Sequence, residues 1–305
     1  MAYPNKLDFS KIYPWSDIKT VQRDGQDMVL FPKFYVKGGF LPETSQYPGK
    51  RYWSVSREKA EGFHCHPAFM NEGKELDYFL LGAYEASNDG SGKPQSLPNK
   101  APWASINTPD AIAACKKRNT GAAGSEQYGW HIESVYEYQA VSLLMLIEMG
   151  APDVQAIIGN GNTSNSVVNT GTTNAVWRGT HEHWANVWEI CDGLKTGASG
   201  QVLIWDKNGN QTYIDTGKVV ADKGFASGST DQYSLDELFI PSNDGSGKAF
   251  SASTADGVWT GSNTVLYLGG SWYHGSCCGL FAFSVNGSAS TSDWNLGFRL
   301  AKYDL

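Results

Sequence analysis

Histidines occur in two closely spaced pairs, the first residues whose type and spacing suggest chemistry. One pair is His64 and His66, and the other is His181 and His183. Side chains two residues apart share a face of a strand, so the four imidazoles could hold a zinc ion. The His-Glu-x-x-His and Cys-x-x-Cys spacings of common zinc sites are absent from the sequence. Structural histidines beside Trp and Pro explain the same residues, and we therefore assign no metal ligand.

Asp206, Asn208 and Asn210 alternate like the first ligands of a calcium-binding loop. Gly209 stands at the wrong position for such a loop, and no Glu occupies its twelfth position. A hairpin turn explains these residues as well. A structural calcium ion held by scattered oxygen atoms stays open. No other cofactor is predicted, because phosphate-binding glycine loops, nucleophile elbows and dinucleotide fingerprints are absent.

The five cysteines are too few, and odd in number, for a disulfide scaffold, which suggests synthesis in a reducing cytoplasm. They are Cys65, Cys115, Cys191, Cys277 and Cys278. The last two are adjacent and invite redox chemistry as a vicinal disulfide. The alternative is that two thiols fall together by chance in a loop rich in Gly and Ser.

The composition of the 305 residues limits the possible classes of protein. A hydrophobic content of 41% is enough for a large core and excludes wholesale disorder. A formal net charge of −7 argues against a nucleic-acid partner, which would require a surface rich in Lys and Arg. No apolar run approaches the roughly 18 residues of a membrane span. The first residues lack the basic and apolar stretches of a signal peptide, so we expect no secretion signal.

Glycine and tryptophan are abundant, with 34 and 11 residues, and together predict many turns and large aromatic anchors. One heptapeptide, Ser-Asn-Asp-Gly-Ser-Gly-Lys, occurs at 87–93 and again at 242–248. Two flexible turns of the same composition explain the repeat. A paired calcium or oligomer contact is the sharper alternative.

Short strands and two helices must position these residues. Asp24-Gly25 predicts a hairpin within 21–31, and Asp206 to Asn210 predicts a second one between 202–205 and 212–215. A third hairpin is expected over 69–81, turning at 71–74. Thr108 as N-cap with Pro109 predicts a helix to about 118. Helical spacing predicts another over 132–149, ended by Gly150. Other short strands are expected at 34–36, 52–55, 264–268 and 297–301.

Two motifs stand near the C-terminal end of the sequence, Gly-Gly-Ser-Trp at 269–272 and Asn-Leu-Gly-Phe-Arg-Leu-Ala at 295–301. Earlier ones are Tyr-Phe-Leu-Leu-Gly-Ala-Tyr-Glu at 78–85, the segments 105–115 and 130–140, and Trp-Ala-Asn-Val-Trp-Glu at 184–189. These motifs resemble those of the formylglycine-generating enzyme (sulfatase-modifying factor) family, in the order in which that family has them. The resemblance implies an α+β, C-type-lectin-like fold. It would be loop-rich, with two helices and twisted antiparallel sheets.

The enzymes of this family carry two cysteines three and eight positions after the Ser of Gly-Gly-Ser. Here these positions hold His274 and Gly279, whereas Cys277 and Cys278 are out of register. The resemblance therefore does not extend to the thiol chemistry of the enzyme.

A branch that keeps this fold for binding is more similar. It comprises the variable proteins of diversity-generating retroelements, common in phage tails. Their last segment before Gly-Phe-Arg is rewritten through codons that cannot encode Met, Gln, Lys, Glu or Trp. Residues 273–293 contain none of these five types, and Trp272 and Trp294 bracket the stretch. A loop rich in Gly and Ser would also avoid most of them.

The segment 273–293 has the residue types of a binding surface. Aromatic side chains give contact area at a low entropic cost, and Ser and Asn give adaptable hydrogen bonds. We expect ligand contacts from Tyr273, His274, Ser276, Cys277, Cys278, Phe281, Phe283, Ser284, Asn286, Ser290, Ser292 and Asp293. Rigid support is expected from Trp272, Trp294, Gly297, Phe298 and Arg299. Alternatively, 281–285 is a core strand, and at least one of its two Phe is then buried.

We divide the chain into an attachment or oligomerisation region, 1–60, and a lectin-like domain, 61–305, with 273–293 as its variable segment. The first region could equally be the first sheet of that domain. The predicted function is a non-enzymatic receptor-binding protein of a phage virion, made in the host cytoplasm. Its expected partners are a bacterial surface protein or glycan, other tail proteins and further copies of the chain. The alternatives are a divergent oxidase using Cys277 and Cys278, and a bacterial surface lectin.

Overall fold

A tight turn at Asp24 and Gly25, whose φ angles are 47° and 70°, starts the sheet of this protein. Positive φ at both residues suits the twist of a two-residue hairpin. The turn joins β1 (Lys19–Arg23) to β2 (Gln26–Pro32), with Arg23 opposite Gln26. This confirms the hairpin predicted from the sequence. The computed structural model describes residues 7–163, 166–242 and 256–304.

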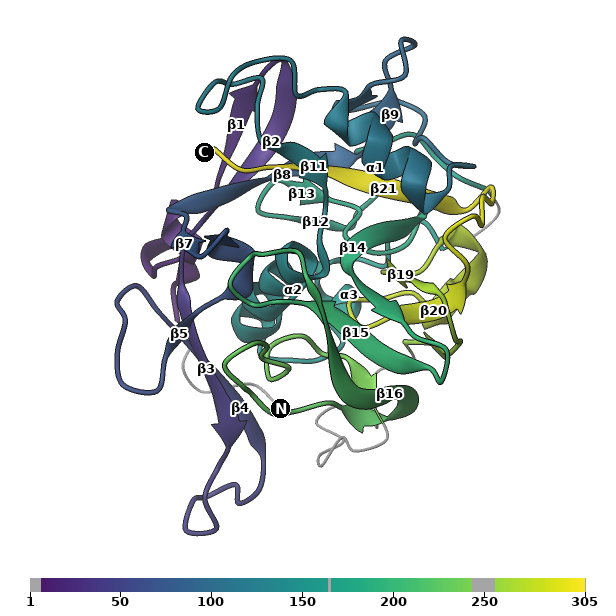
Figure 1. The fold of residues 1–305 in the computed structure, drawn as a ribbon. Coiled ribbons are helices and arrows are strands. Elements are labelled where there is room, and N and C mark those ends of the chain that lie inside the picture. Colours follow the sequence, from purple (N-terminus) through teal and green to yellow (C-terminus); the bar gives the residue numbers. More distant parts are fainter. Residues whose placement is uncertain (1–6, 164–165, 243–255, 305) are drawn as a thin grey trace.

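The hairpin forms one end of a twelve-stranded sheet, in which the main order is β1-β2-β8-β21-β14-β15-β16-β17. Its strands are β1 and β2, β8 (Tyr78–Glu85), β11 (Trp130–Ile132), β14 (Trp188–Thr196), β15 (Gln201–Trp205), β16 (Tyr213–Phe225), β17 (Pro241–Ser242), β18 (Val258–Trp259), β19 (Val265–Leu268), β20 (Phe283–Gly287) and β21 (Leu296–Lys302). Figure 1 shows the C-terminal strand β21 lying beside β8, far earlier in the chain.

Smaller sheets complete the structure. They are β3 (Tyr35–Phe40), β4 (Arg51–Ser56) and β5 (His64–Cys65); β6 (Met70–Asn71) with β7 (Lys74–Glu75); β9 (Ser87–Asn88) with β10 (Pro94–Gln95); and β12 (Val176–Trp177) with β13 (Thr180–His181). The hairpin expected over 69–81 is shorter than predicted. It ends with β7, and β8 leaves to join the main sheet.

Among the described strands two pairs are parallel, whereas the resemblance implied antiparallel sheets. β14 and β21 run parallel, with Glu189 opposite Gly297. β18 and β20 are also parallel, with Val258 opposite Phe283. Parallel strands need a long crossover connection, and such distant partners are not announced by any local turn signal.

The main helix, α2 (Val135–Met149), is buried on all sides along residues 135–146. It begins at a capping box in which Ser134 Oγ accepts from the Glu137 amide and the Glu137 carboxylate accepts from the Ser134 amide. It ends at Gly150, whose φ of 62° is a left-handed cap. A helix apolar on all sides belongs inside a core, and Figure 1 shows α2 near the centre of the molecule.

The other helices are short. α1 (Thr108–Lys116) is capped by Asn107, whose Oδ1 accepts from the Asp110 amide, so the N-cap lies one residue before the predicted Thr108. A third helix not foreseen from the sequence is α3 (Gln155–Ile158). Four 3-10 helices are η1 (Phe9–Lys11), η2 (Trp15–Asp17), η3 (Pro67–Phe69) and η4 (Trp272–Cys277).

Residues 19–32 are part of the main sheet, because β2 pairs with β8 from Met28 opposite Gly82 to Pro32 opposite Tyr78. The boundary at residue 60 stays a prediction. A role of this region in attachment or oligomerisation stays a prediction. Among the described residues, no helix is long and apolar enough to cross a membrane.

Candidate binding site

The strand β20 divides the predicted variable segment into two faces. Phe283 and Val285 of β20 point into the main core, as alternation along a strand requires, and Phe281, which precedes the strand, is buried in the same core. Ser284 and Asn286 point to the other side, where they line a surface pocket. The expectation that at least one of the two Phe is buried is confirmed, since Phe281 and Phe283 are 5% and 1% exposed, but the strand begins only at Phe283.

Four of the residues expected to contact a ligand are buried, which corrects the sequence-based set. They are Cys278, Phe281, Phe283 and Ser284. Phe281 and Phe283 are packed inside the core and cannot contribute contact area to a partner, whereas Ser284, although buried, still lines the pocket. The exposed or half-buried members are Tyr273, His274, Ser276, Cys277, Asn286, Ser290, Ser292 and Asp293.

The pocket beside β20 has a volume of about 260 Å³. It is lined by Trp188, Trp259, Tyr267, His274, Ser284, Asn286, Gly287, Thr291, Asp293, Asn295 and Leu296. Of these, the side chain of Asp293 is the one with a formal charge at neutral pH. The lining thus combines aromatic walls with hydroxyl, amide and carboxylate groups.

Three aromatic rings form the wall of this pocket. Trp188 and Trp259 lie edge to face with ring centroids 5.3 Å apart. The His274 ring lies 5.1 Å from each of them, also edge to face. Burial lowers the pKa of His274, so that the ring is neutral near pH 7.

His274 is held in place by a short chain of hydrogen bonds. Its Nδ1 lies 2.8 Å from Ser271 Oγ, which accepts from Asn295 Nδ2 at 3.1 Å. Ser271 is fully buried and Asn295 nearly so. Ser271 precedes the segment 273–293 and Asn295 follows it, so these hydrogen bonds hold the pocket wall from both ends of the segment.

Exposed aromatic side chains stand beside the pocket. Tyr273 is 68% exposed and Trp294 is 46% exposed, and their rings lie 5.7 Å apart. The half-buried Trp272 packs on Trp294 at 4.7 Å. Trp294 was expected to act as rigid support, and its role as support stays a prediction. Tyr273 and Trp294 are each adjacent in sequence to residues of the pocket lining.

Strand β21 supports this surface from below. Gly297, Phe298 and Arg299 are all buried. The Arg299 guanidinium donates to the Gly82 carbonyl at 3.0 Å, to those of His181 and Glu182 at 2.8 Å, and to Glu189 Oε1. Because the guanidinium of Arg299 donates to Gly82 of β8 and to Glu189 of β14, it fixes β21 relative to these two strands.

All five cysteines are free, so no vicinal disulfide is present. Cys278 Sγ donates to the Ser271 carbonyl at 2.9 Å. Burial raises the pKa of its thiol to about 12, and that of Cys65 likewise to about 12. Because the thiolate is the reactive form, Cys278, one of the two cysteines of the oxidase alternative, is a poor candidate for its reactive group.

The histidine pairs do not assemble into a four-histidine zinc site. His64 Nε2 lies 2.9 Å from Glu237 Oε1, and His66 Nδ1 accepts from the Ala68 amide at 3.2 Å. Within the described residues, the one group of three or more metal-type side chains is a different one, Glu133, His183 and Glu189. The second pair thus contributes one histidine to a cluster that the sequence did not reveal.

In both polar turns singled out in the sequence, an aspartate side chain accepts hydrogen bonds from other residues of the same turn. Asp206 Oδ1 accepts from the Asn208 amide at 2.6 Å and from Asn210 Nδ2 at 3.2 Å, in the turn between β15 and β16. This confirms the hairpin interpretation. In the first heptapeptide, Asp89 Oδ1 accepts from the Ser91 amide at 2.7 Å. The second copy lies outside the described residues from position 243 onward.

Sequence reasoning missed several residues of the pocket, above all Trp188, Trp259 and Tyr267. Trp188 belongs to a motif that was recognised, at 184–189, but nothing in it indicates a surface role. Trp259 and Tyr267 lie on β18 and β19, which pair with β20. Their tertiary neighbours, rather than any local pattern, place them in the pocket.

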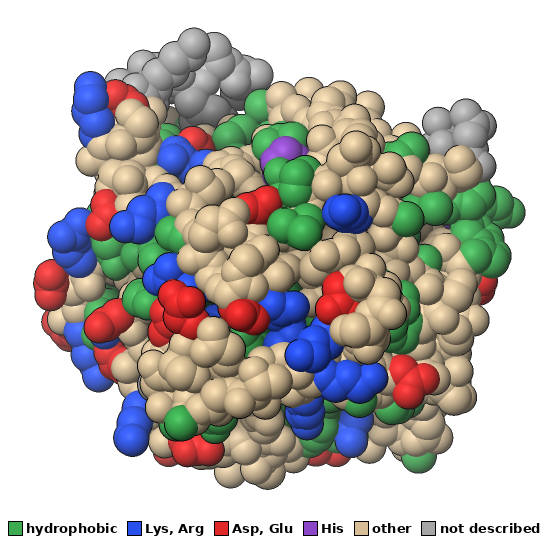
Figure 2. Space-filling view, turned by 90° about the horizontal axis from the view of Figure 1, so that it is seen from above, with side chains coloured by type: hydrophobic (Ala, Val, Ile, Leu, Met, Phe, Trp, Pro, Cys, Tyr) green, Lys and Arg blue, Asp and Glu red, His purple; other side chains and the backbone are tan. Residues whose placement is uncertain are grey.

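Charged side chains are mixed in sign on the face drawn in Figure 2. Lys and Arg stand among Asp and Glu there. Mixed charge gives little attraction to a polyanion, in keeping with the negative net charge.

No family model matches the chain, and no curated protein matches it. Solved structures do match. Treponema denticola variable protein 1 is 13% identical, with a TM-score of 0.41, over 94% of this chain and 99% of its own. The Major Tropism Determinant M1 variant is 11% identical, with a TM-score of 0.38, over 91% of this chain and 63% of its own. PvdO from Pseudomonas aeruginosa is 11% identical, with a TM-score of 0.44, over 94% and 97%.

Proposed function

We propose that this chain is a non-enzymatic binding protein whose ligand surface is the pocket beside β20 together with the exposed rings of Tyr273 and Trp294. The single observation that supports it most is this pair of exposed aromatic side chains at the rim of a pocket with aromatic walls. Large exposed rings are costly to leave in water, and in binding proteins they are the usual anchors.

The chemistry of the surface favours recognition over catalysis. The rings supply contact area, and Asn286, Thr291 and Asp293 supply hydrogen-bond acceptors and donors around the pocket. The imidazole of His274 is tied to Ser271, and the Cys278 thiol is buried. The sheet below holds the surface rigid, which lowers the entropic cost of binding.

The finer proposal is that the chain is an adhesin of a phage tail. Its partner would be a bacterial surface protein or glycan, and its segment 273–293 would be diversified by a retroelement. The support is the residue composition of the segment and the sequence motifs around it. Several copies on one virion would raise a modest single-site affinity through avidity.

Binding of the labelled protein to a panel of bacterial strains and to arrayed bacterial glycans tests the proposal. The variants Tyr273→Ala and Trp294→Ala should each weaken binding at least about tenfold, as loss of an aromatic hot spot does. The matched control is Tyr47→Ala, since Tyr47 is 59% exposed on the distant loop between β3 and β4. Thermal unfolding should be unchanged in all three variants. Retained binding in the double variant, or equal loss in the control, would contradict the proposal.

A further inference from the structure

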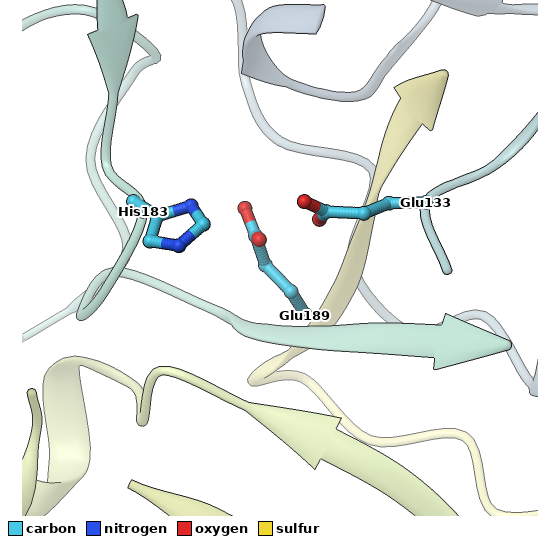
Figure 3. Close-up of side chains that lie close together, drawn as sticks. All are labelled: Glu133, His183 and Glu189. Atoms are coloured by element: carbon cyan, nitrogen blue, oxygen red, sulfur yellow. The ribbon is translucent and has the colours of Figure 1, made fainter. Parts of the chain in front are cut away.

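Three side chains that can bind metals meet in the interior, away from the binding surface. Glu133 precedes α2, His183 follows β13, and Glu189 lies on β14. Each is at most 1% exposed. One potential ligand atom from each lies within 4.8 Å of the other two, and Figure 3 shows the side chains pointing toward one another.

Four polar atoms of this cluster have no hydrogen-bond partner. They are both carboxylate oxygens of Glu133, Oε2 of Glu189 and Nδ1 of His183. Buried polar atoms without partners are rare, because each costs free energy comparable to a lost hydrogen bond. Here four such atoms occur together, and each of them can accept a hydrogen bond.

The tautomer of His183 follows from its neighbours. Ser142 Oγ donates its single proton to the Tyr138 carbonyl at 3.0 Å, as a serine within a helix often does. The same oxygen lies 3.1 Å from His183 Nε2, which must then be the donor. Nδ1 is left with a bare lone pair directed at the carboxylates.

Arg299 does not satisfy the cluster. Its guanidinium donates to Glu189 Oε1 and to three carbonyl oxygens, and Nε stands 4.0 Å from Glu133 Oε2, beyond hydrogen-bond distance. A single proton shared between two groups would pair two of the four atoms. A cation bonded to one atom of each side chain would pair three.

The buried charges also point to a cation. Glu85, close to the same Arg299, has both oxygens in hydrogen bonds, from Asn186 Nδ2 at 2.6 Å and from the Val187 amide at 3.2 Å. Three buried carboxylates face one guanidinium. A divalent cation bound here would add the positive charge that this cluster of buried carboxylates lacks, because buried charges require pairing.

We propose that Glu133, His183 and Glu189 bind one divalent transition-metal ion of the zinc type, which acts as a structural ion. One nitrogen and two carboxylate oxygens are the ligands of Zn²⁺ and its neighbours, whereas Ca²⁺ and Mg²⁺ prefer oxygen alone. Complete burial leaves no open position for a substrate. The inference is independent of the binding role proposed above.

The full chain, unfolded with a chelator and refolded with Zn²⁺ or with the chelator alone, provides the test. The zinc-refolded protein should retain about one ion per chain after desalting and unfold several degrees higher, because a ligand that binds only the folded state stabilises it. Glu133→Gln and His183→Gln should abolish both effects. His181→Gln is the matched control and should keep them, because His181 lies outside the cluster.

Glu133→Gln separates metal binding from a merely structural role. It removes one buried carboxylate, so the metal-free variant should unfold at or above the temperature of the metal-free wild type. Co²⁺ in the wild type should give the visible absorption of a nitrogen and oxygen site, without the charge-transfer band of a thiolate ligand. Failure to retain Zn²⁺, Mn²⁺ or Co²⁺, with the same unfolding temperature in their presence, would overturn the proposal. So would retention of the ion by both cluster variants.

Discussion

Burial, rather than residue type, decides what single side chains do in this protein. His66 and His274 illustrate the point. His66 is completely buried, with its ring 5.2 Å from that of Phe34, whereas His274 forms part of a pocket wall. Both have lowered pKa values because burial disfavours the charged ring.

His66 should make the stability of the protein depend on pH. Burial lowers its pKa to about 4, against about 6.5 in an unfolded chain. Between these values the unfolded chain binds the proton more tightly, so the free energy of unfolding falls as the pH falls. From pH 7 to pH 4.5 we expect a loss of about 2–3 kcal/mol from this group, measured by urea unfolding.

The variant His66→Asn isolates the effect, since its amide oxygen can replace Nδ1 as acceptor for the Ala68 amide. Its stability should depend less on pH over the same window. The comparison of variant and wild type is needed because burial raises the pKa of Asp256 to about 7. Protonation of Asp256 increases the free energy of unfolding as the pH falls, which opposes the effect of His66. Identical pH profiles of variant and wild type would refute the assignment.

At the scale of elements, β20 combines support and recognition in one strand. Its even-numbered face carries Ser284 and Asn286 into the pocket, and its odd-numbered face carries Phe283 and Val285 into the core. Substitutions that diversify the segment should therefore be tolerated on the pocket face of β20 but not on its core face, and these faces alternate along the strand.

Sequencing the 3′ end of the gene in a population of the source phage or bacterium should show this period. We expect substitutions at exposed positions such as Tyr273, Asn286, Ser290 and Ser292. Phe281 and Phe283 should stay large and apolar, because truncation of a buried Phe costs about 3–5 kcal/mol. A uniform sequence would contradict the proposal that a retroelement diversifies the segment. Equal variation on both faces of β20 would contradict the expectation that only its pocket face tolerates substitution.

At the scale of the whole molecule, both ends of the chain build one sheet. β2 and β21 lie on either side of β8, and Phe31 of β2 stacks on Phe79 of β8 at 5.2 Å. Trp15 is also buried and donates from Nε1 to the Leu144 carbonyl of α2 at 3.1 Å. Residues 15–36 therefore contribute to the core.

A chain that lacks residues 1–60 should fail to unfold cooperatively, because β8 would lose a partner strand and the core would lose Val29 and Phe31, both fully buried. Circular dichroism during heating and limited proteolysis measure this. The control replaces residues 42–48, a mostly exposed loop, with a short Asn-Gly turn and should remain cooperative. Cooperative folding of 61–305 alone would instead support the predicted domain boundary.

The local signals in the sequence were sufficient for elements whose causes lie within a few residues. Gly150 ends α2 as predicted, and Asp24-Gly25 defines the first hairpin, whereas the capping box at Ser134 and Glu137 was not recognised, so the helix was expected at 132 and begins at 135. Caps and tight turns depend on neighbouring residues and on allowed φ angles, so they can be recognised without a partner. The small-residue and aromatic content of 273–293 likewise pointed to the surface region that holds the pocket.

Contacts between distant segments were decided only by the tertiary structure. Trp188 and Trp259 meet at the pocket because β14 and β18 are brought together through β19 and β20. Glu133, His183 and Glu189 meet because the start of α2, the end of β13 and β14 converge. Which of Phe283 and Trp294 is buried depends on the layers above and below them. Burial and juxtaposition are properties of the whole packed chain, and no local sequence pattern carries them.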